Sequence, residues 1–296
     1  MTEGTHVPAH HVVRPIRIDG ERRQVLALEM GGASEAVGAE PFVSVAREAI
    51  ARALEARAVV AYAFVRSSVA EQVFAELGMT SLGSFPTLRR PLRLASMAER
   101  LPLPLAVRAM LPRTALVLPF QRKPRPGVRE ITTEDPRFSR LWDRFSIDIL
   151  AAVERNANFV NPRIFGAPDA GYRVFIFEDG DRYVIRALCI FRVVASDRGA
   201  PRGQVVELLH DRSVAGMRAA SHLLGLALRE MSDANAEAVE AWSLPQSGSF
   251  PLYARHAFLP APGDLSFGVR ALDPEVEPLV MARHHWYLSG IDLQSA

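Results

Sequence analysis

The chain has 296 residues, of which 49% are hydrophobic and 23% are charged, and its formal net charge is +2. This composition is typical of a folded globular protein, and the length indicates about two domains. The basic surplus is confined to residues 95–130, which carry 7 basic and 2 acidic side chains. We therefore expect no nucleic-acid partner, because the chain lacks a broad basic surface.

The single cysteine and the pattern of apolar segments indicate where in the cell the protein is located. Cys189 is the only cysteine, which excludes an intrachain disulfide and favours a reducing environment, where we expect it to be a buried thiol. Residues 2–9 lack an apolar core, so we expect no signal peptide. The most apolar run, residues 101–120, is interrupted by prolines and arginines and therefore predicts no membrane span. We predict a cytoplasmic protein.

The first half of the chain alternates between strand and helix patterns. Hydrophobic periodicity predicts strands at 12–18 and 24–30 joined at Asp19-Gly20, a helix at 42–57, a strand at 59–64, a helix at 68–77 and an extended stretch at 88–94.

The second half follows a connection at 95–127, whose end is basic and rich in proline. Its patterns predict a strand at 128–131, a helical face from 138 to 149, hairpin strands at 172–177 and 183–194, a strand at 204–209, a helix at 215–231, a strand at 239–244, a short helix at 250–256 and a last strand near 265–272.

The two halves repeat each other at an offset of 180 residues. The strand at 24–29 matches residues 204–209, and Tyr62 in the strand at 59–64 corresponds to Trp242. We therefore predict one α/β unit used twice. About 60 residues precede the matching region in the second copy and only about 11 in the first, so the N-terminal copy is predicted to be truncated.

The order of elements in residues 128–272 resembles the GNAT superfamily of acyl-CoA-dependent N-acyltransferases. Residues 252–258, Leu-Tyr-Ala-Arg-His-Ala-Phe, are similar to the family's Leu-Tyr-x-x-x-Gly-Phe ending, with Ala257 in place of glycine. The first copy keeps Leu77-Gly78-Met79 but has Phe74 where the tyrosine stands.

The resemblance implies an α/β fold with mixed sheets and two GNAT-like units in tandem. The expected domains are a partial, degenerate unit at 1–94, the connection at 95–127, and a complete unit with a C-terminal tail at 128–296.

The resemblance also implies acetyl-CoA as co-substrate and a small-molecule amine or amino-sugar-like acceptor. Free amides at a helix N-terminus attract anions, so the family's cofactor contacts carry over to the strand at 204–209 and the turn that follows. The corresponding cofactor-binding residues are Leu208, Leu209, His210, Arg212, Ser213 and Gly216.

Neither copy matches the family's phosphate loop, Arg/Gln-x-x-Gly-x-Gly/Ala. The second copy retains Arg212, Gly216 and Arg218, but not at the spacing of this motif. The first has Glu35 and Glu40 at the helix entrance, where carboxylates repel pyrophosphate. We therefore expect the first copy not to bind CoA and the second to be the candidate.

By the same resemblance, Tyr253 is the candidate general acid, and Glu207 or His210 the candidate base. Each has a structural alternative: Tyr253 as an aromatic of the core or surface, Glu207 as a group at a sheet edge, and His210 as a turn residue. No catalytic triad is recognisable.

No metal is expected. Adjacent residues of a strand point to opposite sides, so His284 and His285 are a poor ligand pair for a metal even with Asp292 nearby. The sequence thus leads to two hypotheses: an acyl-CoA-dependent N-acetyltransferase that uses the C-terminal unit, or a non-catalytic GNAT-fold binding protein with a lost phosphate loop. The oligomeric state stays open.

Overall fold

The computed structural model describes residues 9–30, 39–93, 125–180, 183–196, 199–261 and 263–293. Part of the Gly-rich turn, with Glu35, and most of the connection at 95–127 lie outside these residues.

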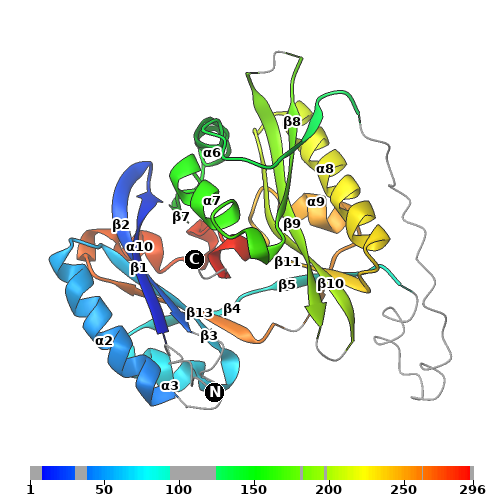
Figure 1. Ribbon diagram of the computed structural model, residues 1–296. Coiled ribbons are helices and arrows are strands. Elements are labelled where there is room, and N and C mark those ends of the chain that lie inside the picture. Colours follow the sequence, from blue (N-terminus) through cyan, green and yellow to red (C-terminus); the bar gives the residue numbers. More distant parts are fainter. Residues whose placement is uncertain are drawn as a thin grey trace.

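The first half contains the predicted alternation of strands and helices (Figure 1). Its elements are β1 (Ala9–Ile18), β2 (Glu21–Met30), α2 (Ala39–Glu55), β3 (Val60–Arg66), α3 (Ser67–Leu77), β4 (Thr80–Ser84) and β5 (Thr87–Pro91). Asp19 and Gly20, with φ of 47° and 81°, turn β1 into β2, as expected of a two-residue hairpin loop whose residues both have positive φ. The predicted hairpin is confirmed.

The second half opens with β6 (Val128–Ile131), and its helical region is divided into shorter elements than the periodicity predicted. The elements that follow are α6 (Phe138–Phe145), β7 (Ala151–Val153), α7 (Ala157–Ile164), the 3-10 helix η1 (Pro168–Ala170), β8 (Arg173–Glu178), β9 (Ile185–Ser196), β10 (Gly199–His210), α8 (Val214–Asp233), β11 (Ala238–Trp242), α9 (Phe250–Arg255), β12 (Leu259–Ala261) and β13 (Leu265–Ala271). A tail of short helices ends the chain: η2 (Pro274–Val276), α10 (Glu277–Val280), η3 (Arg283–His285) and η4 (Gly290–Leu293).

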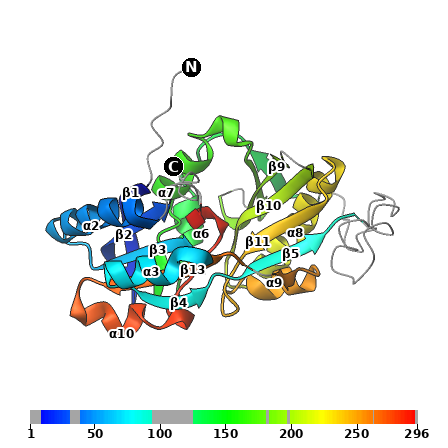
Figure 2. The ribbon, with the colours of Figure 1, turned by 90° about the horizontal axis from the view of Figure 1, so that it is seen from below.

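The strands form two mixed sheets that exchange strands. One sheet has the order β4-β13-β3-β2-β1-β7, and the other has the order β12-β5-β11-β10-β9-β8-β6. The prediction that the stretch at 88–94 completes the first unit was therefore wrong, because β5 pairs with β11 and β12. The last strand, β13, likewise pairs with β3 and β4 of the first unit, as Figure 2 shows. The boundaries at 94 and 128 stay a prediction, but neither sheet is built from one half alone.

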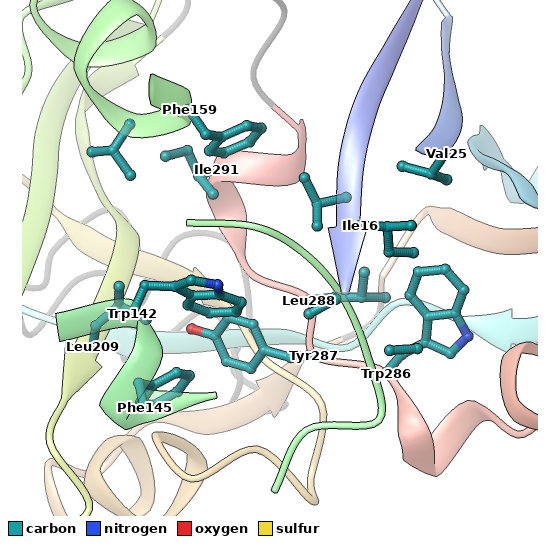
Figure 3. Packing of buried hydrophobic residues seen from close by; sticks show 14 of the residues in the cluster. Ile16, Val25, Trp142, Phe145, Phe159, Leu209, Trp286, Tyr287, Leu288 and Ile291 are labelled. Atoms are coloured by element: carbon teal, nitrogen blue, oxygen red, sulfur yellow. The ribbon is translucent and has the colours of Figure 1, made fainter. Parts of the chain in front are cut away.

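The C-terminal tail lies between the two units and is part of their shared core. Figure 3 shows Trp286 and Leu288 beside Ile16 and Val25 of the first unit, while Tyr287 packs toward Trp142 and Phe145 of the second. All these side chains are buried. The tail therefore joins the two units through apolar burial, which is the main favourable contribution to folding.

Candidate functional site

The two units differ at their central parallel strands. In the first unit, residues 25–29 of β2 pair without interruption with residues 60–64 of β3. In the second, the pairing of β10 with β11 ends at Val205 and Ala241, although β10 continues to His210. An open strand edge is thus present at the end of β10 in the second unit and absent from the paired residues of β2 in the first.

A β-bulge marks the point where β10 leaves its neighbour. The register between β10 and β9 shifts between Val205 and Glu207, so that Val206 is an extra residue without its own partner. Bulges bend a strand and re-aim its groups, and they are frequent beside active sites. The bend at Val206 explains why the last part of β10 separates from β11.

The tail occupies part of the space between the separated strands. Ser289 forms an isolated antiparallel bridge with Ser243, just beyond the end of β11. A Cβ placed on Gly290 would lie 2.9 Å from Cε3 of Trp242 and 3.1 Å from the Cα of Val206. Only a residue without a side chain fits there, so the tail passes directly against the bulge.

Glu207, a predicted base, is completely buried and fully engaged by hydrogen bonds. Its carboxylate accepts from Tyr287 (2.6 Å), Ser289 (2.7 Å), Arg155 Nε (3.1 Å) and the backbone amide of Leu208 (3.0 Å). Burial raises the pKa of this carboxyl group, while Arg155 and the two hydroxyl donors act in the opposite direction. β10 lies inside its sheet, but Glu207 follows the point where the pairing with β11 ends, so the alternative of a sheet-edge residue stays a prediction.

Arg155 connects Glu207 to the tail. Its side chain is completely buried, and it donates to the carboxylate of Asp292 and to the carbonyl oxygen of Val153 (2.7 Å). The guanidinium also lies 5.2 Å from the ring centroid of Phe159. A buried charge needs such partners, because desolvation without them costs several kcal/mol per ion.

His210, the other predicted base, lies at the end of β10 and is almost completely buried. Its Nδ1 lies 2.9 Å from the carbonyl oxygen of Asp211, and its Nε2 lies 3.3 Å from that of Gly248. Both oxygens are carbonyl acceptors, so each contact is a hydrogen bond only when the ring nitrogen carries a proton. The edge of the ring faces Phe145, with 5.5 Å between centroids.

The turn from β10 into α8 is closed by its own residues. Ser213 is the N-cap of α8 and accepts from the amide of Gly216 (2.9 Å). The Asp211 carboxylate accepts from the hydroxyl and the amide of Ser213 and from Arg186 (2.8 Å), and it lies against Gly216, where a Cβ would collide with it. An acidic side chain therefore occupies the place at the helix N-terminus where the resemblance expects pyrophosphate.

Arg212 points away from this turn. Its Nε donates to the carbonyl oxygen of Phe145 (2.8 Å), and its guanidinium pairs with Asp148. The same guanidinium lies against Gly248, where a Cβ would be 2.5 Å from Nη1. Arg212 thus fixes the loop after β11 to the loop after α6.

The two predicted strand residues are buried in different core clusters. Leu208 lies in the core that includes α8, and Leu209 in the core that includes the tail. The carbonyl oxygen of Leu208 accepts from Ser249 Oγ (2.5 Å). The backbone carbonyl of Leu208, a predicted cofactor contact, is therefore already bonded to a protein side chain.

Tyr253, the predicted general acid, is buried on α9. Its ring packs against Phe258, with 5.3 Å between centroids. Desolvation raises the pKa of its hydroxyl well above the ordinary value, so the group is a neutral phenol at physiological pH. A neutral phenol is the protonation state that a general acid requires, and equally that of a core tyrosine.

A groove of about 280 Å³ lies between α8 and α9, and it is lined by Leu252, the neighbour of Tyr253 in the chain, but not by the buried Tyr253 itself. The sequence analysis did not single out most of the residues that line it, which are Val214, Met217, Arg218, Gly248, Pro251, Leu252 and Arg255. Val214 and Met217 are exposed although they are apolar. Two apolar residues one turn apart on the outer face of a helix indicate a surface that binds another group, and this pattern was the signal that could have located the groove.

A second cavity, of about 310 Å³, lies on the other side of Gly248. Its lining combines polar side chains from three loops with two aromatic residues of the tail: Asp148, Ile149, Leu150, Arg212, Gln246, Ser247, Gly248, His284, His285, Trp286 and Tyr287. The tail therefore forms one wall of this cavity.

Asp292 lies apart from His284 and His285, the pair considered with it as metal ligands. Asp292 is buried in the ion pair with Arg155, whereas His284 and His285 line the second cavity. Among the residues described, no three His, Cys, Asp or Glu side chains gather into a group suited to a metal ion. Within the same residues, no helix has the length and apolar character needed to span a membrane.

The fold was compared with known proteins. No protein-family model matches the sequence, and no curated protein matches it. Among solved structures, Saccharomyces cerevisiae N-myristoyltransferase with bound myristoyl-CoA is similar, with a TM-score of 0.58 and 14% identity over 90% of this chain and 69% of that one.

Two bacterial structures are similar as well. A GCN5-related N-acetyltransferase from Anabaena variabilis has a TM-score of 0.56 and 11% identity over 89% of this chain and 59% of its own. A protein of unknown function from Enterococcus faecalis, described as a probable N-acyltransferase, has a TM-score of 0.55 and 10% identity over 90% of this chain and 58% of its own. The chain thus spans about 58–69% of the length of these three structures. Because the matches cover both sheets, the chain has the α/β fold of the GNAT superfamily, with two GNAT-like units in tandem.

Proposed function

We propose that the C-terminal unit is an acyl-CoA-dependent N-acyltransferase that transfers an acetyl group from acetyl-CoA to an amine. The observation that carries this proposal is that Gly248 lines two separate cavities and lies next to His210 at the end of β10. Direct transfer needs a donor and an acceptor that approach one point from different sides. The proposal includes a cytoplasmic location, which the single buried cysteine supports.

In this proposal the acyl donor lies in the groove between α8 and α9. Its apolar residues, among them Met217 and Leu252, suit the pantetheine part of CoA, which is long and largely apolar. Ser249 and the tail at Gly290 fill the space next to β10. A groove of only about 280 Å³ favours a short acyl group, which supports acetyl over a long fatty acyl chain.

The acceptor lies in the second cavity. Asp148, paired with Arg212 through one of its oxygens, keeps a second carboxylate oxygen that suits an ammonium group, and Gln246 and His284 add polar groups for hydrogen bonds. The polar lining and the small volume support a small-molecule amine or an amino-sugar-like compound as acceptor.

The reaction needs one proton removed and one supplied. The amine nitrogen forms a bond to the thioester carbonyl carbon, the carbon–sulfur bond breaks, and the thiolate takes up a proton. We assign the supply to Tyr253, which is a neutral phenol on α9, the helix that forms one wall of the groove. We assign the removal to His210, whose Nε2 lies 3.3 Å from the carbonyl oxygen of Gly248, a residue that lines both cavities. Glu207 is less suited, because Arg155 and three other donors already occupy its oxygens.

The proposal is tested first by binding and then by turnover. Acetyl-CoA in excess is expected to raise the melting temperature, because a ligand that binds only the native state stabilises it. Release of the CoA thiol is then followed with a panel of small amines. Tyr253→Phe and His210→Gln are expected to lower the turnover about 100-fold, as loss of a general acid or base does, while leaving the affinity for acetyl-CoA within a factor of two. Absence of any thermal shift at millimolar acetyl-CoA would refute the proposal.

A non-catalytic GNAT-fold binding protein is the second candidate. Two observations favour it: Asp211 occupies the phosphate turn, and Glu207 is committed to the buried ion pair. This candidate predicts no release of the CoA thiol with any amine of the panel, whether or not acetyl-CoA binds. It also predicts that Tyr253→Phe changes stability and affinity together.

A further inference from the structure

Two arginine side chains line the groove between α8 and α9. Arg218 lies on α8 and Arg255 at the end of α9, and both are exposed. Neither forms an ion pair with any residue that the structure describes, whereas Arg229, three turns further along α8, pairs with Asp233 at 3.6 Å. Two free cations beside an apolar groove suit a ligand that is anionic at one end and apolar at the other.

The turn between β10 and α8 does not offer a comparable site. The Ser213 hydroxyl caps the Gly216 amide, and the Asp211 carboxylate accepts from the Ser213 amide. The pKa of the Asp211 carboxyl is lowered: burial opposes ionisation, but hydrogen bonds from Ser213 and Arg186 outweigh it. A carboxylate that stays ionised there repels a phosphate group, so the anionic end of a ligand in the groove needs other donors.

We infer that Arg218 and Arg255 bind the phosphate groups of CoA and that the turn at 211–216 does not. This inference rests on the proposed function, because it concerns the anionic part of the donor placed in the same groove. A guanidinium binds phosphate through two parallel N–H···O bonds, which a backbone turn with its own acidic cap does not provide. Side chains on two helices thus replace the backbone amides of the turn as the donors to phosphate.

The inference is tested by isothermal titration calorimetry with CoA and with pantetheine, which lacks the phosphates. Arg218→Gln and Arg255→Gln are each expected to weaken CoA binding about tenfold, which corresponds to the loss of one charge-assisted contact. Neither variant is expected to change pantetheine binding more than twofold. Arg229→Gln is the matched control, since it removes the same charge from the same helix about 16 Å away and should leave CoA affinity unchanged.

Each other outcome contradicts the inference in a distinct way. Wild-type protein that binds CoA while both arginine variants bind it equally well would leave the proposed function standing and overturn this assignment. A tenfold loss in Ser213→Ala without a loss in the arginine variants would place the phosphates at the turn instead. Equal loss for CoA and pantetheine in the arginine variants would show that the arginines shape the groove rather than bind phosphate. Wild-type protein that does not bind CoA would overturn both proposals.

Discussion

Arg155 donates from Nε to the carboxylate of Glu207 over 3.1 Å, and both side chains are completely buried. The same guanidinium bonds Asp292 in the tail. One cation therefore ties the segment between β7 and α7 to the bulged strand and to the end of the chain.

Removal of this cation is expected to destabilise the protein strongly. Arg155→Met leaves Glu207 and Asp292 as buried carboxylates without their partner, which typically costs about 3–5 kcal/mol of the free energy of unfolding. Urea denaturation followed by tryptophan fluorescence measures this change. Arg140→Met is the control, because Arg140 is exposed, and its loss should stay within about 0.5 kcal/mol. Equal midpoints for the two variants would contradict a structural role of the buried network.

The contact of Gly290 with the bulge leads to a second prediction. Gly290→Ala places a methyl group 2.9 Å from Trp242 and 3.1 Å from the backbone of Val206, so the tail or the strand must move. Overpacking of this kind costs about 1–3 kcal/mol. Gly180→Ala is the comparison, since no atom lies within 4 Å of the added carbon there. A shift of the melting temperature only in the Gly290 variant is expected; similar shifts in both would argue that the tail is loosely held.

Asp211 is expected to make the free energy of unfolding depend on pH in the acidic range. Its pKa in the folded protein lies below the ordinary value of 3.8, and in the unfolded chain it returns to about 3.9. The native state thus binds fewer protons, so this contribution is present above about pH 4 and is lost as the pH falls through the folded pKa. Asp211→Asn should be less stable than the wild type at pH 7, with a difference that shrinks below pH 4.

Chemical denaturation at pH 7, 5, 4 and 3 checks this dependence. Asp233→Asn serves as control, because its exposed carboxylate has only a 3.6 Å ion pair with Arg229. A wild-type advantage over Asp211→Asn that stays constant down to pH 3 would contradict the assignment.

The exchanged strands predict that the two halves do not fold separately. A fragment of residues 1–93 lacks β13 and β7, and a fragment of residues 125–296 lacks β5, which lies between β11 and β12. Each fragment alone exposes unpaired strand edges, which promote aggregation. We expect each to be insoluble when expressed alone and the pair to form a soluble complex when co-expressed, as judged by size-exclusion chromatography. Two soluble, folded monomers would show that the exchange is dispensable.

Local patterns in the sequence were sufficient for the elements and for the repeated unit. Asp19-Gly20 determined the first hairpin, because both residues accept positive φ. Helical spacing located α2 and α8, and the correspondence of residues 24–29 with 204–209 identified the two central strands. These features depend on neighbours in sequence, so periodicity and turn chemistry suffice to predict them.

The candidate site was predictable only in part. The resemblance pointed to β10, whose last part extends beyond its pairing with β11, and to Tyr253, which is buried on α9 next to Leu252 of the groove. It did not reveal that Glu207 is bound by Arg155, 52 residues earlier in the chain, or that Asp211 fills its own turn. The Glu207–Arg155 contact depends on a partner distant in sequence. The position of Asp211 was predictable from the local Asp-x-Ser spacing, because short polar side chains cap the helix that follows them.

By itself, the sequence determined most of the longer strands and helices, the correspondence of the two central strands and the absence of a disulfide, but not β4, β7, α7 or β12. Only the tertiary structure decided which sheet β5 and β13 join, and that Gly290 and Ser289 lie between β10 and the end of β11. The physical reason is that a periodic pattern records which face of a strand is buried but not which neighbour buries it. Two similar units present nearly equivalent strand edges, and packing over the whole chain selects between them.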